Sequence, residues 1–177
     1  MKRNILVLAV VLVFVGISIY NHIQAQEELI EMPSDTAPKV DHWAPSFELE
    51  AMDGEVYKVG GEKDKPILLN FWASWCGPCE LEAPDFKKLF EQYGDEMDLY
   101  AVNLTQTDRM ANIEEFVGRH QLPFPILLDK DGQIKDLYQV HFIPSTYLID
   151  RHGIVIDIFH TLELKELEKR VKRLIRR

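Results

Sequence analysis

The chain has 177 residues, of which 46% are hydrophobic, so it can bury the core of one domain and still carry appended segments. Its formal net charge of −9 excludes a polyphosphate such as nucleic acid as a partner. Two cysteines are too few for a disulfide framework, and no histidine spacing near them completes a four-ligand metal site, so we expect no bound metal.

The N-terminal segment is basic and then apolar. Lys2 and Arg3 precede residues 5–20, which carry no charge. At about 1.5 Å per residue, a helix of this length spans about 24 Å, somewhat less than a bilayer core of about 30 Å. Two interpretations stay open, a retained membrane anchor or a cleaved signal peptide with Gly16 and Ser18 as small residues at its end.

We expect residues 1–22 to form the anchor, because apolar residues continue past the candidate cleavage site. The positive charge before the apolar run keeps the N-terminus inside and places the rest outside the cytoplasm. The prediction is a single-pass protein of the cell membrane with its folded domain on the extracytoplasmic side. Residues 23–40 are polar and contain prolines, so they are predicted to be a linker before a domain at 41–177.

The domain begins with a predicted β-hairpin. Residues 47–50 alternate between apolar and charged side chains. Asp53 and Gly54 are typical of a turn, and a second alternating segment begins at Val56. Residues 67–72 are apolar on both faces, which is typical of a central strand.

Both cysteines follow this predicted strand, in the run Trp75-Cys76-Gly77-Pro78-Cys79, and apolar residues from 77 to about 93 recur at helical spacing. The N-terminus of that helix offers free N–H groups and partial positive charge, which stabilise a thiolate at Cys76. Cys79 lies close enough to attack a mixed disulfide formed on Cys76. The segment therefore predicts reversible disulfide chemistry.

The remaining elements alternate between strands and helices, which predicts an α/β fold with a mixed central sheet flanked by helices. Residues 161–177 carry a net charge of +4, which we interpret as a solvated helix face rather than as a site for anionic lipid. The expected strands are residues 97–102, 126–128, 146–149 and 154–159, and the expected helices cover 110–117, 134–138 and 164–174.

The run FWASWCGPCELEAP at residues 71–84 and the distant Ile143-Pro144-Ser145-Thr146 resemble thioredoxin-fold proteins. Within that superfamily, residues 40–177 are similar to the TlpA/ResA-type membrane-anchored thiol-disulfide oxidoreductases of the redoxin, or AhpC/TSA-like, group. The resemblance implies the thioredoxin fold with an N-terminal β-hairpin and a central insert at residues 104–129. It also implies a monomer whose redox-active Cys76–Cys79 disulfide serves in place of any cofactor.

The same resemblance implies roles for individual residues. Cys76 is expected to be the exposed attacking thiolate, and Cys79 the buried resolving thiol. Gly77 and Pro78 set the geometry between them and are the pair found in thioredoxin, whose potential is about −270 mV, so a reductant is implied. Pro144 matches the cis-proline of the family. With Trp75 as a flat apolar contact and the free backbone of Ile143, it is expected to bind substrate.

Glu82 lies three residues after Cys79, so a helix brings both to one side. ResA-type proteins carry a glutamate here, whereas Asn70 replaces the aspartate of cytosolic thioredoxin, and an amide cannot take a proton. We hypothesise that Glu82 relays the proton of Cys79, with a pKa raised by burial. The alternative is an ordinary solvated glutamate.

The resemblance implies a reductase of disulfides in exported proteins, with apocytochrome c as the leading substrate and a membrane thiol donor of the CcdA/DsbD type. Two alternatives stay open. A thiol peroxidase of the redoxin group would need a threonine three residues before the reactive cysteine, where this chain has Ala73. A redox-dependent peptide-binding module or chaperone would use the groove beside Pro144 and would still bind without Cys76.

Overall fold

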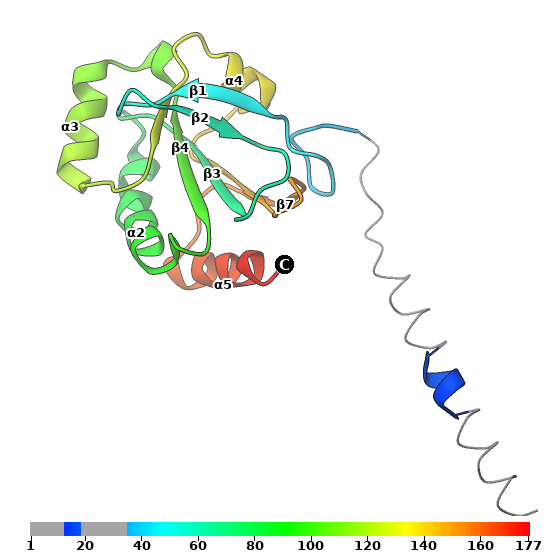
Figure 1. The fold of residues 1–177 in the computed structure, drawn as a ribbon. Coiled ribbons are helices and arrows are strands. Elements are labelled where there is room, and N and C mark those ends of the chain that lie inside the picture. The colour runs from blue at the N-terminus through cyan, green and yellow to red at the C-terminus, as the bar shows by residue number, and fades with distance from the viewer. Residues whose placement is uncertain (1–12, 19–34) are drawn as a thin grey trace, which may run out of the picture. The chain divides into compact units, whose positions relative to one another are not determined.

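The computed structural model describes residues 13–18 and 35–177 (Figure 1). The chain divides into two compact units, Met1–Met32 and Pro33–Arg177. In the first unit, residues 13–18 are helical, while the rest of the predicted anchor and much of the predicted linker lie outside the described residues. Of the helices in the described part, none is long and apolar enough to cross a membrane.

The second unit opens with the predicted β-hairpin. Strand β1 (Phe47–Glu50) pairs antiparallel with β2 (Val56–Val59) in a two-stranded sheet. Gly54 has a φ of 85° in the connecting turn, a left-handed conformation that glycine adopts without strain. The hairpin prediction is confirmed.

The main sheet has five strands in the order β5-β4-β3-β6-β7. The central strand, β3, is parallel to β4 and antiparallel to β6, so the sheet is mixed. Every residue of β3 is buried, as its run of apolar residues predicted. The five strands are β3 (Ile67–Trp72), β4 (Asp98–Asn103), β5 (Ile126–Leu128), β6 (Ser145–Ile149) and β7 (Val155–Phe159).

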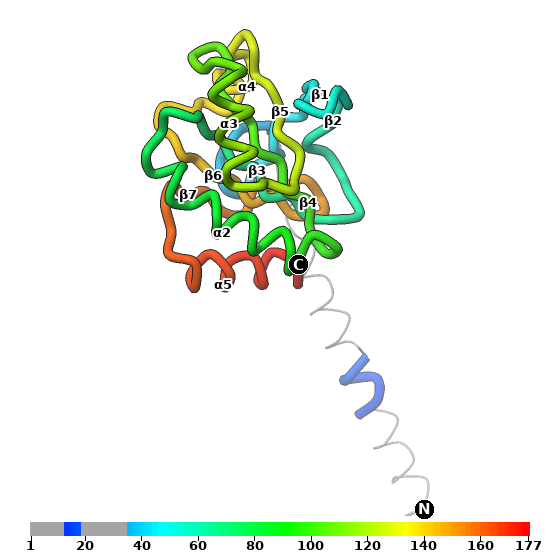
Figure 2. The backbone as a smooth tube through the Cα atoms, turned by 90° about the vertical axis from the view of Figure 1, so that its left-hand side faces the viewer, coloured from blue at the N-terminus to red at the C-terminus, as the bar shows by residue number. Residues whose placement is uncertain are grey.

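Two apolar layers cover the sheet, because successive side chains of a strand point to opposite faces. Leu68 belongs to the layer that also holds the buried residues of α2, α3 and α5, whereas Leu69 packs with the hairpin and α4. Figure 2 shows α5 beside α2 at the lower edge of the domain. The helices are α2 (Gly77–Tyr93), α3 (Met110–His120), α4 (Gln133–Leu137) and α5 (Leu164–Ile175), with a short 3-10 helix η1 (Thr105–Thr107).

The sheet fixes where the chemistry occurs. Strand β3 ends at Trp72, and after four connecting residues the chain enters α2 at Gly77. Phe71 pairs with Ser145, so the start of β6 lies at the same end of the sheet as the cysteines. The C-terminal end of β3 and the N-terminal end of β6 therefore lie together at one end of the sheet.

Candidate active site

The two cysteines form a disulfide at the first turn of α2. Cys76 is the N-cap residue of the helix, and its Sγ accepts a hydrogen bond from the backbone N–H of Cys79 at 3.2 Å. Gly77 and Pro78 lie between the cysteines and start the helix, where the missing N–H of a proline costs nothing. The N-cap position favours negative charge, so it would lower the pKa of a Cys76 thiol.

The two cysteines are buried to nearly the same extent in this disulfide form. Cys79 is 2% exposed, as predicted, but Cys76 is only 5% exposed, so the prediction of an exposed Cys76 is wrong here. The physical reason is that Cys76 joins the core layer that contains Trp72 and Ala73, at the point where β3 enters α2. Little of Cys76 is therefore open to an approaching substrate sulfur in this form.

The peptide bond between Ile143 and Pro144 is cis, as the resemblance implied. Pro144 directly precedes β6, and its carbonyl lies 2.9 Å from Nδ1 of His160. Within the described residues, neither the N–H nor the carbonyl of Ile143 has a hydrogen-bond partner. The backbone beside the cis-proline is thus free to pair with an extended peptide.

Trp75, directly before Cys76, is exposed to solvent but fixed in orientation by a hydrogen bond. Its side chain is 59% exposed, while the indole Nε1 donates to the carbonyl of Thr107 at 3.0 Å. This bond fixes the ring against η1, so a flat apolar surface stands beside the disulfide with little conformational freedom left to lose.

Glu82 is buried on the inner side of α2, 7% exposed. Burial raises its pKa to about 8, against the opposing effect of the Asn70 amide, which donates to Oε1 at 3.1 Å. Glu82, Cys79, Asn70 and Trp72 share the wall of a cavity of about 10 Å³. That volume is far too small for a substrate group and is about the minimum that holds one water molecule.

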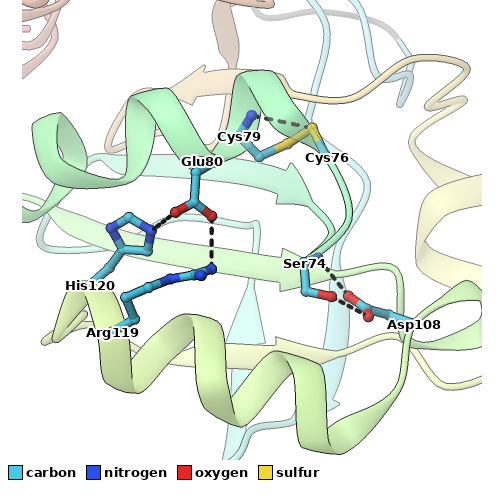
Figure 3. A network of polar contacts seen from close by, with 7 residues as sticks. All are labelled: Ser74, Cys76, Cys79, Glu80, Asp108, Arg119 and His120. Atoms are coloured by element: carbon cyan, nitrogen blue, oxygen red, sulfur yellow. Dashed lines mark hydrogen bonds and ion pairs between the residues drawn. A yellow bond between two sulfur atoms is a disulfide. The ribbon is translucent and has the colours of Figure 1, made fainter.

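Polar contacts missed by the sequence interpretation hold this segment against α3 (Figure 3). The Asp108 carboxylate accepts hydrogen bonds from the backbone N–H of Ser74 at 2.7 Å and from its hydroxyl at 2.6 Å. It also accepts from the Asn103 amide at 3.0 Å and from the N–H of Arg109 at 2.8 Å. Asp108 therefore ties the chain before Cys76 to the start of α3.

The other end of α3 contacts the residue after Cys79. Glu80 lies 2.8 Å from His120 Nε2 and 3.0 Å from Arg119 Nη2 (Figure 3). Between the two ends, Phe116 stacks on Trp72 with ring centroids 4.5 Å apart. Nothing in the local spacing signals these contacts, because their partners are more than thirty residues apart in sequence. In the described ranges, no cluster of His, Cys, Asp and Glu is arranged to hold a metal ion.

Replacing Asp108 with alanine should destabilise the domain by about 1–3 kcal/mol, because the Ser74 N–H and the Asn103 amide lose their acceptor. Burial alone would raise the pKa of Asp108, but these hydrogen bonds outweigh it and lower the pKa. Its stabilisation is therefore present above about pH 4 and disappears as the pH falls further. Urea unfolding between pH 2.5 and 7 measures both effects. The exposed Asp136→Ala is the control, and an equal loss in the two variants would contradict the assignment.

A mixed sheet, a disulfide on the N-terminus of the helix after the central strand and a facing cis-proline together define a thioredoxin-fold protein that exchanges thiols and disulfides. Residues 40–158 match the AhpC/TSA family, and the chain belongs to that family. It is a thiol-disulfide oxidoreductase of the ResA/DsbE type.

The relatives support this class. The thiol-disulfide oxidoreductase ResA of Bacillus cereus is 31% identical over 146 residues, which cover 79% of each chain. The thioredoxin-like protein YneN of Bacillus subtilis is 41% identical over 90 residues, 50% of this chain and 53% of that one, so the match spans about half of its length. The crystal structure of a putative thiol:disulfide interchange protein DsbE from Chlorobium tepidum superposes with a TM-score of 0.68 at 29% identity, covering 75% of this chain and 95% of that chain.

Proposed function

We propose that the protein is an extracytoplasmic, membrane-tethered reductase of disulfides in exported proteins, with apocytochrome c as its leading substrate. The observation that carries the proposal is the disulfide at the N-cap of α2 beside an unpaired Ile143 backbone, which suits exchange with an extended polypeptide. The Gly-Pro pair between the cysteines supports reduction over oxidation.

The reaction balances without a cofactor. In the reduced protein, the Cys76 thiolate attacks one sulfur of the substrate disulfide, forms a mixed disulfide and expels the other sulfur as a thiolate, which takes a proton. Cys79 then attacks Cys76 Sγ, the mixed bond breaks, and the second substrate sulfur leaves as a thiol. Two electrons pass from the protein to the substrate. A thiol donor, for which we propose a membrane protein of the CcdA/DsbD type, returns them.

Glu82 is proposed as the acceptor of the proton that Cys79 loses in the second step. The product of that step is a protonated Glu82 beside a disulfide, and this is the form that burial favours in the structure. A carboxyl group whose pKa lies near the working pH is suited to move a proton in either direction.

The proposed location rests on the sequence and on relatives. Basic residues followed by an uncharged apolar run support an N-terminal anchor with the domain outside. A structural relative at 26% identity and a TM-score of 0.65, the thioredoxin Etrx1 of Streptococcus pneumoniae, is an exposed lipoprotein. An added protease should remove the domain from cells whose wall and any outer membrane have been stripped, whereas protection until the cytoplasmic membrane is lysed would overturn the location.

A direct experiment tests the substrate. The reduced full chain is mixed with an oxidised peptide that carries the Cys-x-x-Cys-His haem-attachment sequence. We expect one peptide disulfide to be reduced for each protein molecule. If a small aromatic disulfide is reduced but the peptide stays oxidised, apocytochrome c is not the substrate. If neither is reduced, the reductase proposal itself fails, and consumption of hydrogen peroxide would then favour the peroxidase alternative.

A further inference from the structure

A second cavity lies next to the disulfide, on the side of Trp75 that faces η1 and α4. Its volume is about 180 Å³, and its wall includes Trp75 and Ile143, the direct neighbours of Cys76 and Pro144. Pockets for whole small molecules usually measure about 300–1,000 Å³, so this cavity suits one side chain rather than a cofactor. It is separate from the small cavity beside Glu82, which shares none of its residues.

The lining of the cavity includes buried aliphatic side chains and exposed aromatic ones. Leu104 and Val140 are buried in the wall, while Phe142 is 75% exposed. Trp75, which also lines the cavity, is held in place by its bond to Thr107. Two exposed aromatic rings beside a reactive disulfide form an apolar surface of the kind that marks an interaction site.

The Asp129 carboxylate is buried in the wall and is already satisfied, and the exposed Gln106 is tied to a neighbouring loop. The Asp129 carboxylate accepts from the backbone N–H groups of Ile134 and Lys135 at 3.2 and 2.8 Å. The amide of Gln106 donates to the carbonyl of Asp131 at 3.0 Å. Lys135 and His141 also line the cavity but are not buried, so polar partners lie toward solvent. In the buried part of the wall, a charged or amide side chain would lose its water without gaining a free partner, whereas an apolar side chain would gain burial.

We infer that this cavity is a specificity pocket for a large apolar or aromatic side chain of the substrate polypeptide, within two residues of the cysteine that Cys76 attacks. The inference rests on the proposed function. The cavity is continuous with the expected peptide-binding surface, because Ile143 and Trp75 both line it. A peptide would pair with the free backbone of Ile143 and place its cysteine at Cys76. It would then pass over Trp75 and so over the mouth of the cavity. The occupant is thereby one side chain of the disulfide-bearing substrate.

Paired peptides test the inference. Each peptide carries one disulfide. Four positions are varied, the two before and the two after one cysteine of that disulfide. For each position, one peptide of the pair has phenylalanine and the other has serine. For at least one position, the wild-type full chain should reduce the phenylalanine peptide with a kcat/KM about tenfold or more above its serine counterpart. Equal rates at all four positions would overturn the pocket while leaving the reductase intact. Failure to reduce any peptide would instead count against the proposed function.

Two variants locate the preference in the cavity. Phe142→Ser removes an exposed lining residue, and Val140→Met fills the interior, so each should bring the ratio of the two kcat/KM values close to one. If Val140→Met does not fold, Phe142→Ser alone tests the pocket. The exposed Phe142 side chain supports little of the core, so its loss should not prevent folding. Val56→Ser is the control, because Val56 is another exposed apolar residue, at 64%, and lies in β2 away from the cavity lining. Retention of the preference in Phe142→Ser, or its loss in Val56→Ser, would contradict the assignment.

Discussion

Replacing Cys76 with serine should lower the rate of disulfide reduction by at least about a thousandfold, because the attacking sulfur is lost and a hydroxyl is not ionised at neutral pH. Cys79 cannot substitute for it, since its side chain lies on the inner side of the first turn of α2, in the wall of the small cavity beside Glu82, whereas Cys76 occupies the N-cap. Reduction of insulin with a thiol donor in excess measures the loss.

The matched variant is Cys79→Ser, which keeps the attacking thiol but cannot resolve the mixed disulfide. It should complete the first step and stop with one substrate covalently bound to Cys76, which mass spectrometry of the intact complex detects. Two results would contradict these roles: a bound substrate in Cys76→Ser, or full turnover in Cys79→Ser.

Replacing Glu82 with glutamine should make the oxidised protein more stable at alkaline pH. The folded-state pKa of Glu82 is about 8, above the ordinary 4.5, so the folded state holds a proton that the unfolded chain has lost between those values. The wild-type free energy of unfolding therefore falls by about 1.4 kcal/mol for each pH unit in that window from this group alone. Glutamine stays neutral, so the variant should exceed the wild type by about 3–5 kcal/mol near pH 8 and match it near pH 4.

Urea unfolding of the oxidised proteins from pH 4 to 9 measures this difference, and no free thiol titrates in that form. Glu91→Gln, on the exposed side of the same helix, is the control and should keep the wild-type slope. In the reduced enzyme, Glu82→Gln should also slow turnover about 10- to 100-fold, because the proton of Cys79 loses its acceptor. Parallel stability curves with unchanged turnover would show that Glu82 is an ordinary carboxylate.

The elements of the fold could be predicted because each has a strong local pattern. The apolar run of β3, the Asp53-Gly54 turn and the helical spacing of α2, α3 and α5 are all found where the sequence placed them. The strand boundaries moved by one residue at most, as at β4, which begins at Asp98 rather than residue 97, because hydrogen-bond pairing and not hydropathy ends a strand. Helix α3 extends three residues beyond the expected 117, to His120.

The candidate site was predictable only where a motif is contiguous or a resemblance supplies it. Cys76 and Cys79 were evident from spacing, and Pro144 was found through the family likeness. Asp108 and His120 were not, because each meets its partner across more than thirty residues of chain. The burial of Cys76 was missed for the same reason: solvent exposure at a strand–helix junction depends on what packs there in three dimensions.

The attachment of α3 at both of its ends has a consequence for engineering. Ser74 and Glu80 bracket the cysteines, and each is bound to an opposite end of that helix. A graft of the CGPC turn alone into a foreign scaffold would leave both supports behind. The stretch from Ile67 through His120 carries the strand, the reactive turn and both supporting contacts together, and the cis-proline segment before β6 would have to accompany it.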